Sequence, residues 1–207
     1  IVTGWGSMIV APRGYLSAIR NLTNKYGTML ILDEVGTGFS RTGKLFAYQL
    51  DNITPDLITL AKAMTNGVAA MGACLVNGDK IKNLIGQAKV LSSLAWMPLA
   101  CSAAIKVIEI HKRAHLWETA ETNGNWLQQE LKSRIPNSLI KEVRGMGMEI
   151  GLEFKDSQLT KPVVEKSFTN GLYLRQSDDT IIQIMPPINT PKNLLEEGLN
   201  ILTKAVG

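Results

Sequence analysis

Short, continuous and mostly apolar runs constrain the fold of this 207-residue chain more than any other feature. Three runs share this pattern: Met29–Leu32, Leu57–Leu60 and Ala73–Val76. The first leads directly into Asp33 and Glu34, and the second is followed by Ala61 and Lys62. Because these runs do not alternate between apolar and polar residues, they predict strands that are buried on both faces, as in a parallel sheet.

Helices are predicted before and after these strands, where apolar residues recur three or four positions apart. The expected helices are Gly14–Lys25, Gly78–Ala88, Pro98–Arg113, Leu116–Ser133, Lys161–Thr169 and Pro191–Val206. Gly27 is a suitable cap for the end of the first helix. Pro98 suits the first turn of a helix.

Beyond about Lys141 the chain changes character, and short strands alternate with helices. The expected strands are Met148–Phe154, Gly171–Arg175 and Ile181–Met185. The pattern predicts an α/β fold, in which part of a large parallel or mixed sheet is followed by a smaller α+β domain. We expect the boundary near His115, which divides the chain into residues 1–114 and 115–207.

Composition narrows the class of protein. Hydrophobic residues make up 45% and charged residues 19% of the chain, which predicts a folded core. The longest nearly uncharged apolar run, Gly67–Val76, is about half of the roughly 20 residues that a membrane-spanning helix needs. The net charge of +4 comes from scattered lysines and arginines, so neither a membrane nor a nucleic acid is expected as a partner.

The cysteines and the first residue add two expectations. Cys74 and Cys101 are too few for a disulfide framework, which favours a reduced, cytoplasmic location. Cys74 lies in a strand pattern and is expected to be an inert, buried thiol. Because the chain starts at Ile1 and enters a motif at once, we expect it to be part of a longer protein.

The acids after the first apolar run have two interpretations. Gly38–Lys44 matches the G-x-x-x-x-G-K pattern of a phosphate-binding loop, but Leu45 replaces the hydroxyl residue that would bind magnesium, and no strand leads into the loop. In the other interpretation, an acid at the carboxyl end of a strand holds a cationic ring nitrogen. Lys62, after the next strand, has a placement typical of an imine-forming lysine, although a surface lysine is an equal alternative.

Taken together, these segments resemble the signature of the class III pyridoxal-phosphate aminotransferases. This family includes the ornithine, acetylornithine, 4-aminobutyrate and diaminopelargonate aminotransferases. The order of many positions and the spacing between acid and lysine are both preserved. The matching segments are Leu32–Gly43, Pro55–Lys62, Gly4–Tyr15, Pro98–Cys101, Val143–Gly147 and Met185–Pro187.

The resemblance implies a set of roles for single residues. Lys62 would hold pyridoxal 5'-phosphate covalently and then move a proton as general base and acid. Asp33 would pair with the pyridine nitrogen of the cofactor, and Val35, on the same strand face, would pack against the ring. Ser93 stands where the family has a threonine that reaches the phosphate in the neighbouring subunit. The family therefore implies a homodimer with shared active sites that acts on an amine and an oxo-acid.

Four departures from the family qualify these expectations. Gly36 replaces a frequent glutamine, and Ala95–Pro98 replaces Gly-Gly-Asn-Pro. Gln183 stands where members that act on α-carboxylates often have an arginine, and a neutral amide cannot form a charged clamp. An ω-amine or diaminopelargonate-like donor is therefore favoured over an ornithine-type or 4-aminobutyrate-type donor. The fourth departure is that the family's N-terminal half is absent, so the chain resembles a C-terminal half that is inactive alone.

Alternatives remain open. The same scaffold resembles aminomutases, racemases and decarboxylases, and the chain could also be a non-catalytic remnant. His111 and His115 are four residues apart on an expected helix, but no third zinc ligand accompanies them. The tryptophans are expected in the core or at an interface: Trp96, Trp117 and Trp126.

Overall fold

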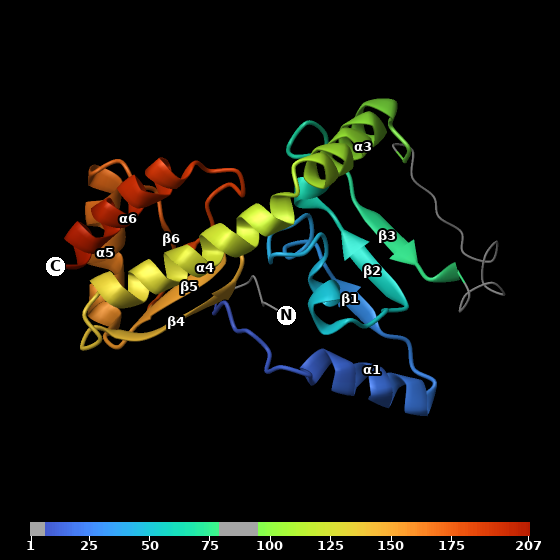
Figure 1. The fold of residues 1–207 in the computed structure, drawn as a ribbon, viewed down its shortest axis with the longest axis horizontal. Helices are drawn as coiled ribbons and strands as arrows, with labels where there is room; N and C mark the ends of the chain where they lie inside the picture. Colours follow the sequence, from blue (N-terminus) through green and yellow to red (C-terminus); the bar gives the residue numbers. More distant parts are fainter. Residues whose placement is uncertain (1–6, 79–94) are drawn as a thin grey trace.

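The computed structural model describes residues 7–78 and 95–207, and it contains two separate sheets in this part of the chain (Figure 1). The first sheet has the order β1 (Ile31–Asp33), β2 (Leu57–Leu60) and β3 (Ala73–Val76). β1 and β2 are parallel, whereas β2 and β3 are antiparallel. The three predicted strands are confirmed, and the sheet that they form is mixed.

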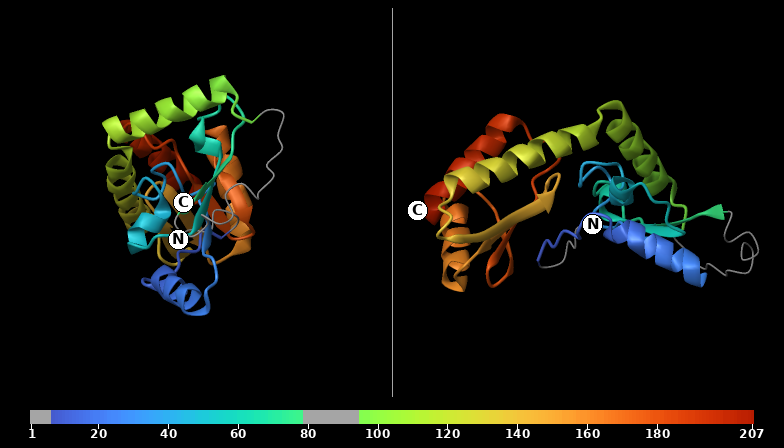
Figure 2. Two further views of the ribbon diagram at one scale, coloured as in Figure 1. Left: turned by 90° about the vertical axis from the view of Figure 1, so that its right-hand side faces the viewer. Right: turned by 60° about the horizontal axis from the view of Figure 1, so that its bottom comes forward.

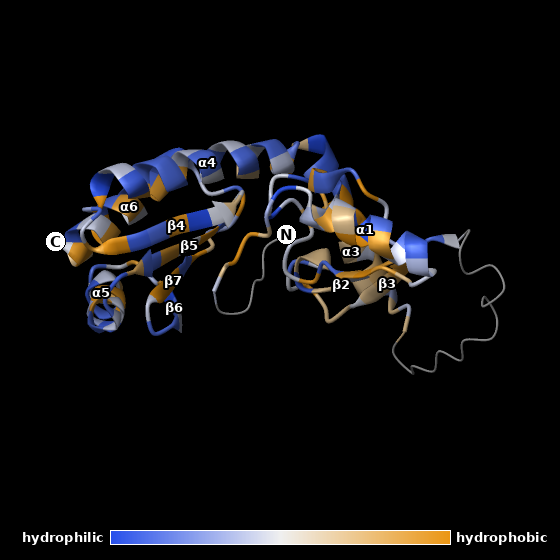
Figure 3. Ribbon diagram, turned by 90° about the horizontal axis from the view of Figure 1, so that it is seen from below, coloured by the Kyte–Doolittle hydropathy of each residue, from blue (hydrophilic) through white to orange (hydrophobic). Residues whose placement is uncertain are grey.

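The prediction that these strands are buried on both faces is wrong for β1 and β3. Ile31 is 58% exposed and Leu75 is 48% exposed, and only β2 has a regular alternation of buried residues. Cys74 on β3 is likewise exposed, not buried as expected. Val76 on β3 is exposed as well, and Figure 3 shows hydrophobic colouring along β2 and β3.

The first sheet is accompanied by helices that largely match the sequence pattern. α1 (Tyr15–Tyr26) ends at Gly27, which adopts the left-handed conformation with φ 64° and caps the helix as predicted. α3 (Pro98–Arg113) begins at the proline that suits a first turn. Two short 3-10 helices, η1 (Ala47–Asp51) and η2 (Lys62–Met64), follow β1 and β2 along the chain. The predicted helix Gly78–Ala88 lies almost wholly outside the described residues.

The second sheet is antiparallel throughout, with the order β4-β5-β7-β6. Its strands are β4 (Ile140–Met146), β5 (Glu149–Phe154), β6 (Arg175–Asp178) and β7 (Ile181–Ile184). Three helices accompany it: α4 (Leu116–Arg134), α5 (Ser157–Thr169) and α6 (Lys192–Val206). Leucine, isoleucine and valine side chains from these helices and strands form one large buried core.

Two boundaries in this half differ from the sequence pattern. The strand expected at Gly171–Arg175 lies instead at Arg175–Asp178, because Gly171 has φ 91° and forms a turn that ends α5. α5 begins four residues earlier than expected, because Asp156 caps its first turn by accepting a hydrogen bond from the Gln158 amide. β4 was indicated only by a family motif.

The long helix α4 connects the two groups of elements, and the molecule has an elongated outline with one group at each end (Figures 1 and 2). Ala114 and His115 separate α3 from α4, and His115 adopts a left-handed conformation with φ 48°. The start of the described chain crosses to the second group: Met8 is buried against Gly151. The helices in the described ranges include none that is long and apolar enough to cross a membrane.

Candidate active site

Asp33 ends β1 at the carboxyl edge of the first sheet. Its register partner on β2 is Thr59, whose hydroxyl donates a hydrogen bond of 3.1 Å to Asp33 Oδ1. The backbone amide of Val35 donates a second bond of 2.9 Å to the same oxygen. These two bonds hold one carboxylate oxygen and orient an exposed side chain at the end of the strand.

Lys62 follows β2 at the same edge, three residues after the register partner of Asp33. It opens η2 in a left-handed conformation with φ 49°, which costs a non-glycine residue about 1 kcal/mol. In the described part of the chain its side chain is exposed. Because β1 and β2 are parallel, their carboxyl ends meet, and Asp33 and Lys62 lie at one edge.

The second acid of the pair has a different environment from the first. Glu34 is buried and accepts hydrogen bonds from the Thr37 hydroxyl and from the backbone amides of Ala47 and Tyr48. It therefore ties the loop after β1 to η1. Asp33 ends β1 with an exposed side chain, whereas Glu34 lies just beyond the strand and is buried against the loop and η1.

Val35 does not lie on a strand. β1 ends at Asp33 and Val35 is in the turn that follows, so the expectation that both share a strand face is wrong in its geometry. Its side chain is half-buried, and its backbone amide donates the hydrogen bond to the Asp33 carboxylate. The adjacent Gly36 is open, because a Cβ added there would meet nothing within 4 Å.

The loop that matches G-x-x-x-x-G-K has a compact turn structure. Gly38 is so close to Glu34 that an added Cβ would lie 2.8 Å from the Glu34 carbonyl oxygen. Ser40 receives a hydrogen bond from the Gly43 amide, and a short 3-10 helix follows Lys44 where a phosphate-binding loop would open an α-helix. The geometry does not support a nucleotide-phosphate site.

The two histidines do not share a helix face. His111 lies on α3, where its Nδ1 is 2.7 Å from the Ser40 hydroxyl, whereas His115 lies beyond the end of that helix. Burial, followed by the charge of Arg41, lowers the pKa of His111. His111 therefore connects α3 to the loop after β1, and the expected i, i+4 arrangement on one helix is wrong.

The sequence model of the aminotransferase class-III family matches residues 1–206. This chain belongs to the class-III aminotransferase family. It is 30% identical to the acetylornithine aminotransferase of Bacillus cereus over 100% of this chain and 53% of that protein. It is 29% identical to ornithine aminotransferase 1 of Staphylococcus saprophyticus over 99% of this chain and 51% of that protein.

Solved structures agree with this assignment. The acetylornithine aminotransferase from Elizabethkingia anophelis superposes with a TM-score of 0.92 at 29% identity, over 99% of this chain and 54% of that one. The ornithine aminotransferase from Plasmodium yoelii superposes with a TM-score of 0.89 at 32% identity, over 97% and 53%. The chain thus spans about half the length of the relatives that it matches.

The other positions that the sequence analysis singled out differ in their burial. Ser93 lies outside the described residues. Gln183 is buried on β7, where its register partners are Gly151 on β5 and Arg175 on β6. Trp126 packs partly buried against the core of the second half, as expected, but Trp96 is 85% exposed and is not a core residue within the described chain.

Glu149, at the start of β5, is a residue that the sequence patterns did not single out. It is fully buried, and neither carboxylate oxygen has a hydrogen-bond partner among the described residues. Burial raises the pKa of Glu149 from 4.5 to about 7, although the positive charges of Arg41 and Lys62 act against the shift. The sequence signal that could have identified Glu149 is a single acidic residue between Met148 and Ile150 in a predicted strand.

Proposed function

We propose that this chain is the C-terminal half of a pyridoxal-phosphate-dependent aminotransferase that moves an amino group from an amine or amino acid to an oxo-acid. In this proposal residues 1–114 complete a large cofactor-binding domain, and residues 115–207 form a small α+β domain. The supporting observation is that Asp33 and Lys62 follow neighbouring parallel strands and share one edge of the sheet. Because the chain spans about half of its relatives, activity is assigned to the whole protein.

The residues at this edge suit the chemistry of the cofactor. Asp33 Oδ1 is held by Thr59 and Val35, and Oδ2 takes no part in these two bonds. A fixed carboxylate of this kind holds a proton on a pyridine nitrogen. A lysine amine at the same edge can bind an aldehyde carbon. Pyridoxal phosphate, when bound, supplies an electron sink for the substrate carbon, and the structure of a Toxoplasma gondii relative was determined with partial occupancy of it.

Each residue has one task in the proposed reaction. The Asp33 carboxylate would accept a hydrogen bond from the ring nitrogen and favour its protonated form. Lys62 Nζ would hold the cofactor and, once its amine is free, would move a proton as general base and acid. Val35 would pack against the ring. Ser93 would reach the phosphate of the neighbouring subunit's cofactor, which implies a homodimer with shared sites.

The proposed amine donor and the proposed cellular location each rest on one or two residues. Gln183 supplies a neutral amide, which favours an ω-amine or diaminopelargonate-like donor over one clamped by its α-carboxylate. The free cysteines Cys74 and Cys101 favour the cytoplasm. Gly36 and Gln183 also leave room for an aminomutase, racemase or decarboxylase on the same scaffold.

The test uses the full-length polypeptide that contains this chain, loaded with pyridoxal phosphate. Borohydride reduction followed by peptide mass spectrometry should place the reduced adduct on Lys62, and Lys62→Arg should abolish it. An adduct on another lysine contradicts the assignment. No adduct at all indicates a non-catalytic remnant.

Half-reaction spectroscopy with an amine donor then separates the reactions. Amino transfer leaves the cofactor in its pyridoxamine form, whereas an aminomutase, racemase or decarboxylase returns it to the pyridoxal form.

A further inference from the structure

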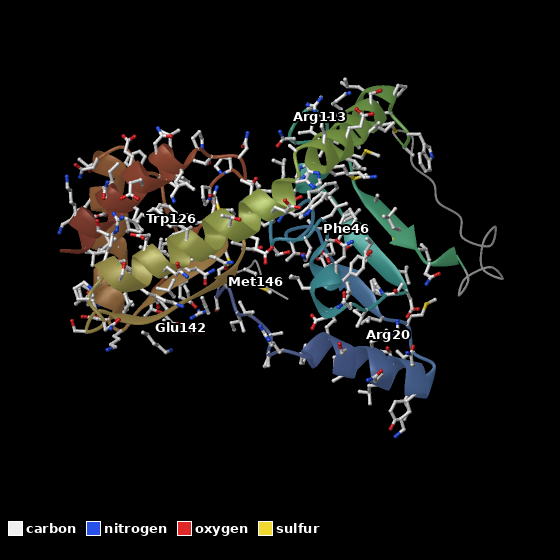
Figure 4. The ribbon with its side chains drawn as sticks, in the orientation of Figure 1. Arg20, Phe46, Arg113, Trp126, Glu142 and Met146 are labelled. Carbon is white, nitrogen blue, oxygen red and sulfur yellow. The ribbon has the colours of Figure 1, made fainter. Side chains whose placement is uncertain are left out.

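The loop after β1 meets the second half of the chain at a closely packed joint. The joint consists of Arg41–Gly43 in the loop, Gly147–Met148 in the β4–β5 turn and Gly124 on α4. A Cβ added at Gly147 would lie 2.5 Å from the Arg41 carbonyl oxygen, and one added at Gly124 would lie 1.9 Å from the Gly147 carbonyl oxygen. Figure 4 shows Met146, at the end of β4, between the two groups of elements. The two halves therefore meet backbone to backbone at this turn, where only glycine fits.

Arg41 holds this joint together with both its backbone and its side chain. Its carbonyl oxygen accepts a hydrogen bond of 3.0 Å from the Met148 amide. Its guanidinium donates through Nη1 to the carbonyl oxygens of Met148 and Pro186, at 3.1 and 2.6 Å. Met148 directly precedes β5, and Pro186 follows the end of β7. One side chain of the first half therefore bonds to the second half at the start of β5 and beyond the end of β7.

The bonds of Arg41 are of a kind that holds a fixed position. A guanidinium is planar and keeps its charge, so its bonds to carbonyl oxygens are charge-assisted. Burial lowers the pKa of Arg41, and the negative charge of Glu149 acts against this shift. Because the group is partly withdrawn from water, separation of the joint would leave a desolvated cation without its acceptors. The bonded arrangement is therefore favoured over an open one.

The other connections between the halves constrain different places. Only Ala114 and His115 separate α3 from α4, so the covalent connection is a short turn. Arg144 on β4 donates two hydrogen bonds to the Ser7 carbonyl oxygen, which holds the start of the described chain against the second sheet. Neither connection reaches the loop that leaves Asp33. Arg41 lies in that loop and bonds it directly to the second half.

We propose that Arg41 is a positioning residue, which fixes the end of β7 against the edge that carries Asp33 and Lys62. Gln183 lies on β7 shortly before Pro186, so the Arg41 bond to Pro186 holds the same end of the strand. An amine donor bound between this edge and β7 then meets both halves in one arrangement. The inference rests on the proposed function, because it takes the edge as the cofactor site.

Hydrogen exchange of the full-length protein, loaded with pyridoxal phosphate, tests the contact itself. The Met148 amide reports whether the loop and the turn stay together, since its acceptor is a backbone oxygen that a substitution of Arg41 leaves in place. In Arg41→Ala the protection of this amide should fall by roughly tenfold or more, whereas the Leu152 amide in the middle of β5 should keep its protection. Arg134→Gln is the matched control, because Arg134 bonds α4 to α6 within the second half, and it should leave Met148 unchanged.

The half-reaction with the ω-diamine putrescine as probe supplies the functional readout. In Arg41→Ala the putrescine concentration for the half-maximal rate should rise roughly tenfold while the limiting rate stays within about twofold, the pattern of impaired donor binding. Arg41→Lys should restore part of the loss, because an ammonium group can donate to one of the two carbonyl oxygens. Arg134→Gln should match the parent protein.

Three outcomes overturn the inference. The first is an unchanged protection of the Met148 amide in Arg41→Ala. The second is an equal loss of protection at Met148 and Leu152, which would make Arg41 a residue of overall stability. The third is a lower limiting rate with an unchanged putrescine dependence. The borohydride experiment fails independently: an adduct on a lysine other than Lys62 refutes the proposed function, and the Met148 amide still decides whether Arg41 holds the two halves together.

Discussion

The two sheets of this chain differ in how completely their own helices cover them. The second sheet has a core in which Ile150, Leu152 and Ile182 are fully buried beneath α4, α5 and α6. The first sheet has a smaller buried cluster and leaves Ile31 and Leu75 exposed. The residues proposed to do chemistry lie on the incompletely covered sheet. The comparison teaches that the second half is the better packed within the described residues, whereas the half that contains Asp33 and Lys62 leaves apolar side chains of its sheet exposed.

Hydrogen exchange should give the largest difference between the two regions. In the isolated chain, amides of β5 should exchange only through global unfolding, whereas those of β1 should exchange through local opening. The expected gap is several kcal/mol in the free energy of opening, because β1 has few buried contacts. Mass spectrometry of proteolytic peptides measures it. Equal protection in both strands would break the comparison.

Truncation of one side chain in each sheet should show that the two sheets contribute differently to the free energy of unfolding. Leu152→Ala removes a fully buried side chain from the second core and should lower the free energy of unfolding by about 3 kcal/mol. Ile31→Ala, the matched change in the first sheet, should cost within about 0.5 kcal/mol in the isolated chain. Urea denaturation measures both values. A larger loss for Ile31→Ala would mean that the first sheet is covered.

Glu149 makes the stability of the chain depend on pH. Its pKa is raised in the folded chain from 4.5 to about 7, so its contribution is fully present below pH 4.5 and is lost as the pH rises through about 7. The expected loss is roughly 3 kcal/mol. Glu149→Gln should remove this dependence in urea titrations at a series of pH values.

Glu153, four residues further along β5, supplies a control of opposite sign. Burial acts against its ionised form, but hydrogen bonds from Lys141 and Arg144 hold the pKa of Glu153 below its ordinary value. Its contribution is therefore present at neutral pH and lost as the pH falls through the lowered pKa. A loss of stability toward high pH that persists in Glu149→Gln would rule out Glu149 as its source.

The smallest effect is expected at Gly36 in the loop after β1. An added side chain meets nothing within 4 Å, so Gly36→Gln should change the free energy of unfolding by no more than about 0.5 kcal/mol. Gly38→Ala is the matched change at a crowded site, where the Cβ would lie 2.8 Å from the Glu34 carbonyl oxygen, and it should cost more. Urea denaturation measures the free energy of unfolding of both variants. Equal losses in Gly36→Gln and Gly38→Ala would show that the site of Gly38 is no more crowded than that of Gly36.

Local pattern was sufficient to predict most of the elements. The apolar runs predicted β1, β2 and β3, and helical spacing predicted α1, α3, α4 and α6 within a few residues. The Asp33-to-Lys62 spacing indicated the family, which the family model confirmed. These features depend on residues close together in the chain, where the backbone period decides which side chains share a face.

Tertiary structure alone decided the rest. No local rule distinguishes a covered strand face from an exposed one, so Ile31 and Cys74 were expected inside. The partners of Glu34 and His111 come from other elements, and the burial of Glu149 depends on the meeting of two halves that are far apart in sequence. The sequence by itself determined most of the secondary structure and the family. The burial of Glu149 and the shift of its pKa were decided only by the three-dimensional packing. The reason is that desolvation depends on every neighbour in space and not on chain order.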